Sequence, residues 1–195
     1  MDKERNVIQM HRFIHSIIRR NSVNAALQHA GVYKEHTPQK IRKGFTNSAK
    51  VWLVRFADNY QRDNETPESW QKTINRLIQH LSDEFRPHLE GGRVRIGVAQ
   101  KMISLYLKHR WLIADDDTKK PLFAVVDRVI MKKAKIRNMP NWTQLNDMNE
   151  YMRIVREIDE FARSQIKPNQ PGEYYTDGAS WESDVWTEAD VDEDK

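Results

Sequence analysis

A lysine and an aspartate 26 positions apart carry the most specific chemistry in the sequence. Lys101 ends the segment Gly97-Val98-Ala99-Gln100-Lys101, and Asp127 follows the apolar stretch Phe123-Ala124-Val125-Val126. A lysine partly buried among apolar residues loses proton affinity, as an amine nucleophile requires. A carboxylate at the start of another helix, brought in by the apolar extended segment before it, could face that amine. We therefore predict that Lys101 and Asp127 converge on one cleft as a catalytic pair.

Basic residues and a glycine near this pair predict contacts to phosphates. Gly97 stands at the expected start of a helix, where backbone N–H groups can approach an anion closely and the helix dipole favours negative charge. Arg93 and Arg95 flank this turn, and Lys108, His109 and Arg110 follow further along. A second basic cluster comes after Asp127. The predicted nucleic-acid-binding residues are Arg93, Arg95, Gly97, Lys132, Lys133, Lys135 and Arg137.

The segments around Lys101 and Asp127 resemble the helix–hairpin–helix DNA glycosylase superfamily, which includes the 8-oxoguanine DNA glycosylases. That family carries a Gly-Val-Gly-x-Lys-like turn and then an apolar segment ending in Val-Asp. The match spans about residues 91–131, and Ala99 replaces the family's second glycine. The resemblance implies that Lys101 attacks C1′ of a flipped nucleotide to form a Schiff base. It implies that Asp127 stabilises the cationic sugar and moves protons, with no cofactor.

Ordinary structural roles fit the same residues. Gly97 could simply begin a helix, Lys101 could be a solvated side chain, and Asp127 could be an N-cap. Three hypotheses about function therefore stay open. The first is a base-excising DNA glycosylase/lyase of DNA repair that acts on duplex DNA with an extruded base. The second is a non-catalytic helical nucleic-acid-binding protein, and the third is a protein-interaction component, for example of a phage or an immunity system.

Charge divides the chain into two parts. The chain has 195 residues and a formal net charge of +4. From Glu173 onward there are nine acids and one base, a charge of −8, so residues 1–172 carry +12. We predict a basic helical domain over 1–172, as expected of a protein that binds a phosphate backbone, and an acidic, aromatic-containing tail over 173–195 that becomes ordered only when something binds it. This tail could contact a protein partner or the chain's own basic body.

Several classes of protein are excluded by composition. The chain has no Cys, which excludes disulfide scaffolds, Cys-ligated zinc and thiol nucleophiles. No apolar run approaches the roughly 18 residues that a membrane span needs, so we expect no membrane contact and a cytoplasmic location. His11 and His15 are spaced i,i+4, but their surroundings lack further ligands, and we expect no metal site. Most tryptophans fit helical core stripes, although one could line a pocket for an extruded base.

The elements that position these candidate residues are all expected to be helical. The predicted fold class is therefore all-α, a compact multi-helix domain with a central buried helix. Apolar spacing predicts that central helix over Ile96–Ile113. Capping and proline signals place the other boundaries. The remaining expected helices include an N-terminal one whose apolar stripe contains Val7, Ile8, Phe13, Ile14, Ile17 and Ile18, a short one from Ser22 to Gly31, one from Thr37-Pro38 to about Gln61 with a break near Gly44, one from Thr66-Pro67 to Phe85, one from Arg128 to about Ile136, and one from Asp147 to Gln165.

Overall fold

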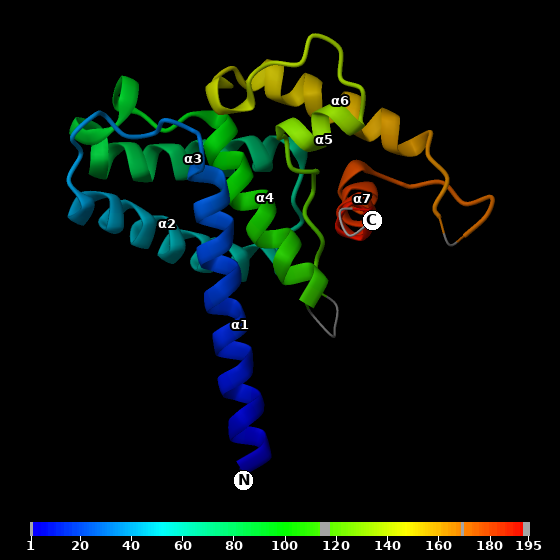
Figure 1. Ribbon diagram of the computed structural model, residues 1–195, viewed down its shortest axis with the longest axis horizontal. Helices are drawn as coiled ribbons and strands as arrows, with labels where there is room; N and C mark the ends of the chain where they lie inside the picture. Colours follow the sequence, from blue (N-terminus) through cyan, green and yellow to red (C-terminus); the bar gives the residue numbers. More distant parts are fainter. Residues whose placement is uncertain (1, 114–117, 169, 193–195) are drawn as a thin grey trace.

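A computed structural model describes residues 2–113, 118–168 and 170–192. Within these ranges the chain forms seven α-helices, three short 3₁₀ helices and no strand, which confirms the all-α class. Figure 1 shows α4 in the middle, with α2 and α3 on one side and α5, α6 and α7 on the other. No helix in the described part of the chain has the length and apolarity needed to cross a membrane.

The central helix α4 (Ile96–Ile113) is the core of the molecule, as its sequence predicts. Every residue from Ile96 to Lys108 is buried except Lys101. Helix α1 (Asp2–Leu27) packs along α4, and α2 (Gln39–Tyr60) and α3 (Pro67–Phe85) complete the packing on one side. Lys101 is therefore the one residue of this span whose side chain reaches an opening.

Helix α1 is a single continuous helix, so the predicted separate helix from Ser22 to Gly31 is wrong. Ser22 lies inside it, where the buried hydroxyl donates to the Ile18 carbonyl one turn earlier. The predicted apolar stripe is only partly a core face, because Ile18 is buried while Phe13 is 66% exposed. The N-terminal end of α1 extends beyond the other helices (Figure 1).

The starts of α2 and α3 show that only one of two Thr-Pro signals is a cap. Thr66 caps α3, as predicted, and the structure adds a capping box with Ser69. Thr37 does not cap α2, because its hydroxyl donates to backbone carbonyls of Lys34 and His88. The predicted break at Gly44 is also wrong: α2 continues through it, and the Phe85 ring packs against its open side.

Short elements connect and follow α4. The 3₁₀ helices η1 (Arg86–His88) and η2 (Glu90–Gly92) lead into it. Helix α5 (Arg128–Lys133) is shorter than predicted, because the chain turns at Lys135, where φ is 54°. The 3₁₀ helix η3 (Trp142–Gln144) precedes α6 (Met148–Arg163), and Asp147 caps α6 as predicted.

The acidic segment after residue 172 packs on the helical body. Its helix α7 (Gly178–Asp192) follows Tyr175, and the side chains of Tyr175, Trp181 and Glu182 are buried. That the segment becomes ordered only when something binds it stays a prediction. In the described residues, the two parts of the chain on either side of 172/173 therefore differ in charge but pack together. The tail's last residues, 193–195, lie outside the described residues.

Candidate active site

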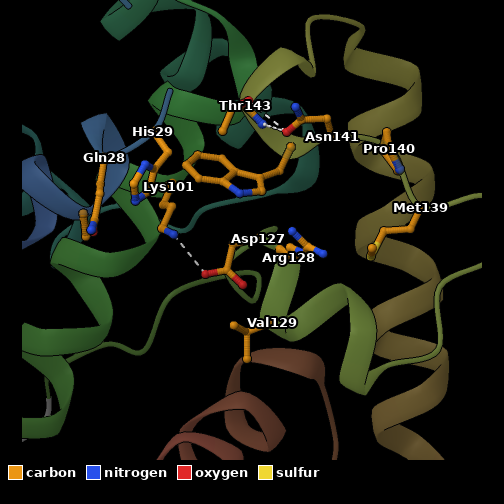
Figure 2. Close-up of a pocket in the computed structure, with 12 residues that line it drawn as sticks. Gln28, His29, Lys101, Asp127, Arg128, Val129, Met139, Pro140, Asn141 and Thr143 are labelled. Atoms are coloured by element: carbon orange, nitrogen blue, oxygen red, sulfur yellow. Dashed lines mark hydrogen bonds and ion pairs between the residues drawn. The ribbon is translucent and has the colours of Figure 1, made fainter. Parts of the chain in front are cut away.

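Lys101 and Asp127 meet at the wall of a cavity of about 660 Å³, and this confirms the predicted convergence (Figure 2). The Lys101 Nζ lies 3.0 Å from the Asp127 Oδ2. The side chains are 13% and 5% exposed, so both groups are largely withdrawn from water yet border the open space. The cavity falls in the range of about 300–1,000 Å³ that is typical of ligand sites. The catalytic roles of the two residues stay predictions.

Asp127 is held in place by hydrogen bonds to the extended segment before it. The buried amide of Gln100, next to Lys101 on α4, donates to the Val126 carbonyl (2.7 Å) and accepts from the Val126 N–H (3.2 Å). Glu182 of α7 accepts from the Val125 N–H (2.8 Å). These bonds fix the segment between α4 and α7. As a result, the position of the backbone before Asp127 fixes the distance between the Asp127 carboxylate and the Lys101 ammonium.

The Asp127 carboxylate has two roles in this geometry. Its Oδ1 accepts from the Ile130 N–H at 3.0 Å and caps α5, while its Oδ2 faces Lys101. The expected N-cap is therefore present together with the ion pair. One oxygen fixes the residue, and the other stays directed at the cavity.

Gly97 permits a close backbone contact, but the partner differs from the prediction. Its N–H donates to the Leu145 carbonyl at 3.0 Å, and a Cβ at this position would lie 1.8 Å from the Trp142 carbonyl oxygen. The backbone of η3 thus occupies the space in which we expected a phosphate. Gly97 is buried and is a packing residue that brings η3 onto the start of α4.

Trp142 forms an aromatic wall of the cavity, carried there by η3. The Lys101 Nζ lies 4.3 Å from the centroid of its ring, a cation–π distance. The predicted core position of most tryptophans holds for the fully buried Trp70 but not for Trp142. The residues around Trp142 do carry a sequence signal. Pro140-Asn141-Trp142-Thr143 is typical of a capped turn, and Asn141 does cap η3.

The rest of the cavity wall comes from residues that sequence analysis missed. Figure 2 shows Gln28 and His29 at the end of α1 on one side of Lys101, and Met139 and Pro140 on the other. His29 adopts φ of 57°, which is uncommon for a residue other than glycine. Arg128 of α5 adds a cation beside Asp127. These loop-end residues have no helical periodicity, so no pattern marked them.

The residues predicted to contact phosphates lie in two kinds of environment, buried and exposed. The Arg95 guanidinium donates to backbone carbonyls of Thr143 (2.6 Å), Gly31 (3.2 Å) and Ala30, and burial lowers its pKa. Arg95 therefore ties α4 to its neighbours instead of facing a phosphate. Lys108 is likewise buried and pairs with Glu182 at 2.5 Å. The predicted cations that stay exposed are Arg93, Lys132, Lys133, Lys135 and Arg137, none of which lines the cavity.

Comparison of the chain with protein-family models, with curated proteins and with solved structures gave no match. The resemblance to DNA glycosylases thus rests on the residues around Lys101 and Asp127 alone.

Proposed function

We propose that the protein is a DNA-binding enzyme that excises a base from a flipped nucleotide, with Lys101 as the nucleophile. The observation that supports this most is the Lys101–Asp127 pair, 3.0 Å apart at the edge of a 660 Å³ cavity and next to an indole ring. Enzymes that act on a base take it out of the stack and hold it against aromatic and apolar side chains. Trp142 and Met139 offer such a surface.

In this proposal Asp127 removes the proton that keeps Lys101 unreactive. A general base must lie within about 2.6–3.2 Å of the atom whose proton it takes, and Asp127 Oδ2 does. The Lys101 ammonium transfers a proton to Asp127, and the freed lone pair bonds to C1′ of the sugar. The C1′–N bond to the base breaks, and the base leaves with that electron pair and the proton from Asp127.

A second proton transfer completes the Schiff base. Asp127 takes one more proton from Nζ, now attached to C1′, and passes it to O4′ as the C1′–O4′ bond breaks. The remaining electron pair on Nζ forms the C1′=Nζ bond, so the product is an iminium ion facing an Asp127 carboxylate. Borohydride reduces this bond to a stable amine, which makes the intermediate measurable.

DNA would be held by the exposed cations that follow Asp127. Arg128 lines the cavity, and Lys132, Lys133, Lys135 and Arg137 lie exposed within the next nine residues. Each phosphate neutralised by such a cation releases counterions, so binding should weaken steeply with salt. Arg95 and Gly97 are left out of this proposed interface because their donors are already used within the chain.

Two variants separate the chemistry from binding and folding. Lys101→Arg keeps a cation opposite Asp127 but removes the nucleophile, so borohydride trapping on a duplex with one 8-oxoguanine or one abasic site should be lost while binding persists. Asp127→Asn keeps an N-cap for α5, since Asn caps about as well as Asp, but lacks the base. We expect it to slow trapping by about 10²–10⁴-fold. Equal trapping by wild type and both variants would refute the proposal.

The exposed cations from Arg128 to Arg137 also favour a second candidate, a non-catalytic nucleic-acid-binding protein. Salt-dependent DNA binding with no trapping and no effect of Asp127→Asn would select this function. A protein without DNA affinity at low salt would instead leave a role in protein interaction.

A further inference from the structure

A second cleft lies where α1, α2 and α4 meet, and it shares no lining residue with the Lys101 cavity. Its volume is about 280 Å³. Five of its lining side chains are basic and one is acidic. They are His11, Arg12, His15 and Arg19 of α1, Arg110 of α4 and Asp58 of α2.

The positive charge of this cleft is only weakly offset. The Asp58 carboxylate is 62% exposed and lies 3.6 Å from Arg110, an arrangement that is strongly screened by water. The ion pairs formed among the described residues include none with Arg12 or Arg19. Two guanidinium groups, with planar donors suited to an oxyanion, are thus left without an acidic partner in that part of the chain.

His11 and His15 are in contact in the cleft, and the surroundings of His15 couple its protonation to the binding of an anion. The Nε2 atoms of His11 and His15 lie 2.9 Å apart, so one ring donates the N–H and the other accepts it. Burial lowers the pKa of His15, and the positive charges of His11, Arg110 and Arg19 lower it further. Among the described residues that line the cleft, Tyr106 is a further polar group and Asp58 is the carboxylate. A bound anion would offset this repulsion and favour the charged, donating form of His15.

We propose that this cleft is a phosphate-binding site in which Arg12, Arg19 and the His11–His15 pair contact the oxyanion. The surrounding guanidinium groups disfavour a metal cation at the two imidazoles, although an i,i+4 histidine pair could otherwise chelate one. The phosphate is either a phosphodiester of a nucleic-acid backbone or a free phosphate. The site is independent of the reaction proposed for Lys101.

A histidine titration followed by NMR tests the site with inorganic phosphate as the probe. At constant ionic strength, replacing chloride by phosphate should raise the pH midpoint of His15 by about one pH unit, the smallest effect of a nearby opposite charge. Arg19→Gln should weaken phosphate binding by about tenfold, the loss of one charged hydrogen bond. Arg20→Gln is the matched control, because Arg20 is exposed on the same helix and does not line the cleft.

Duplex DNA distinguishes the two sources of phosphate. If Arg19→Gln and His15→Gln weaken duplex binding more than Arg20→Gln does, the ligand is a backbone phosphodiester. If these variants lose inorganic phosphate but bind duplex as the control does, the ligand is a free phosphate. An unchanged His15 midpoint in phosphate, together with equal behaviour of Arg19→Gln and Arg20→Gln in both assays, would overturn the proposal.

Discussion

At the scale of single residues, the approach of η3 to α4 depends on the missing side chain of Gly97. The Trp142 carbonyl oxygen lies where a Cβ would be, and the Leu145 carbonyl accepts the Gly97 N–H. This contact places the Trp142 ring over the Lys101 ammonium. A glycine four residues before the lysine thus helps to build the cavity without touching its contents.

Gly97→Ala should be severely destabilising, because the clash is with backbone, which cannot move like a flexible side chain. We expect a loss of about 3 kcal/mol or more in the free energy of unfolding, the upper part of the range for overpacking. Gly44→Ala is the matched control inside α2, where the new methyl group would meet the Phe85 ring at 3.4 Å. It should stabilise by about 0.5–1 kcal/mol. Urea denaturation measures both, and equal effects would contradict this role for Gly97.

Gly97 shows which contacts of a single residue can be predicted from the sequence. A glycine near a helix start correctly indicated a close approach, but the approaching group lies 45 positions further along the chain and left no local pattern. The Lys101–Asp127 pairing could be predicted because an apolar segment before a capping aspartate is itself a local pattern. The turn that carries Trp142 could be predicted from Pro140 and Asn141, but the direction of its ring could not, since a residue in a turn has no periodicity to show which way it points.

At the scale of elements, α1 and α4 are joined by a partly buried polar contact. The Ser22 hydroxyl lies 3.0 Å from the His109 Nδ1, and burial lowers the pKa of His109 from 6.5 to about 4. The unfolded chain therefore binds more protons than the folded one between these two pH values. It follows that the contribution of neutral His109 to stability is complete above pH 6.5 and is lost as the pH falls toward 4.

His109→Gln should remove this component of the acid sensitivity. For wild type we expect His109 to contribute a loss of about 2 kcal/mol between pH 7.5 and pH 5, from about 1.4 kcal/mol per pKa unit. The variant should lack that loss, which chemical denaturation at the two pH values measures. His36→Gln, which replaces a histidine whose side chain is 89% exposed, is the matched control. An identical pH dependence of His109→Gln and wild type would contradict the assignment.

The helices themselves were largely predictable, and their exceptions have identifiable causes. Thr66 caps its helix because its hydroxyl is free to accept from Ser69, whereas the Thr37 hydroxyl is drawn to the His88 carbonyl, 51 residues away. The Gly44 break did not occur because tertiary packing against Phe85 holds α2 together. Local propensity decides such boundaries only where no distant contact competes with it.

At the scale of the whole molecule, a buried ion pair joins the acidic segment to the basic body. Glu182 of α7 reaches Lys108 of the central helix, and its other oxygen accepts from the Val125 N–H. Burial raises the pKa of Glu182, while Lys108 acts against this rise. The composition predicted the difference in charge between the two parts of the chain. It could not predict that Glu182 is buried against Lys108, because a buried acid looks the same in sequence as its exposed neighbours.

Deleting residues 173–195 should therefore unfold much of the protein rather than expose a DNA-binding face. It removes the buried Tyr175, Trp181 and Glu182 and leaves Lys108 without a partner. Losing one member of a buried pair alone costs about 3–5 kcal/mol, against a total stability of about 5–15 kcal/mol. Deleting only 188–195 retains these contacts and should keep the thermal midpoint within a few degrees. Cooperative unfolding of the longer deletion at the wild-type midpoint would contradict this prediction.

The most direct test of the proposed function is to locate the covalent bond itself. Wild-type protein is reduced with borohydride on a duplex with one abasic site, digested, and mapped by peptide mass spectrometry. An abasic site removes the question of which base is recognised, and exposed lysines such as Lys132 serve as internal controls for unspecific reaction. We predict that the deoxyribose adduct lies on Lys101. An adduct spread over the exposed lysines, with Lys101 unmodified, would contradict the account.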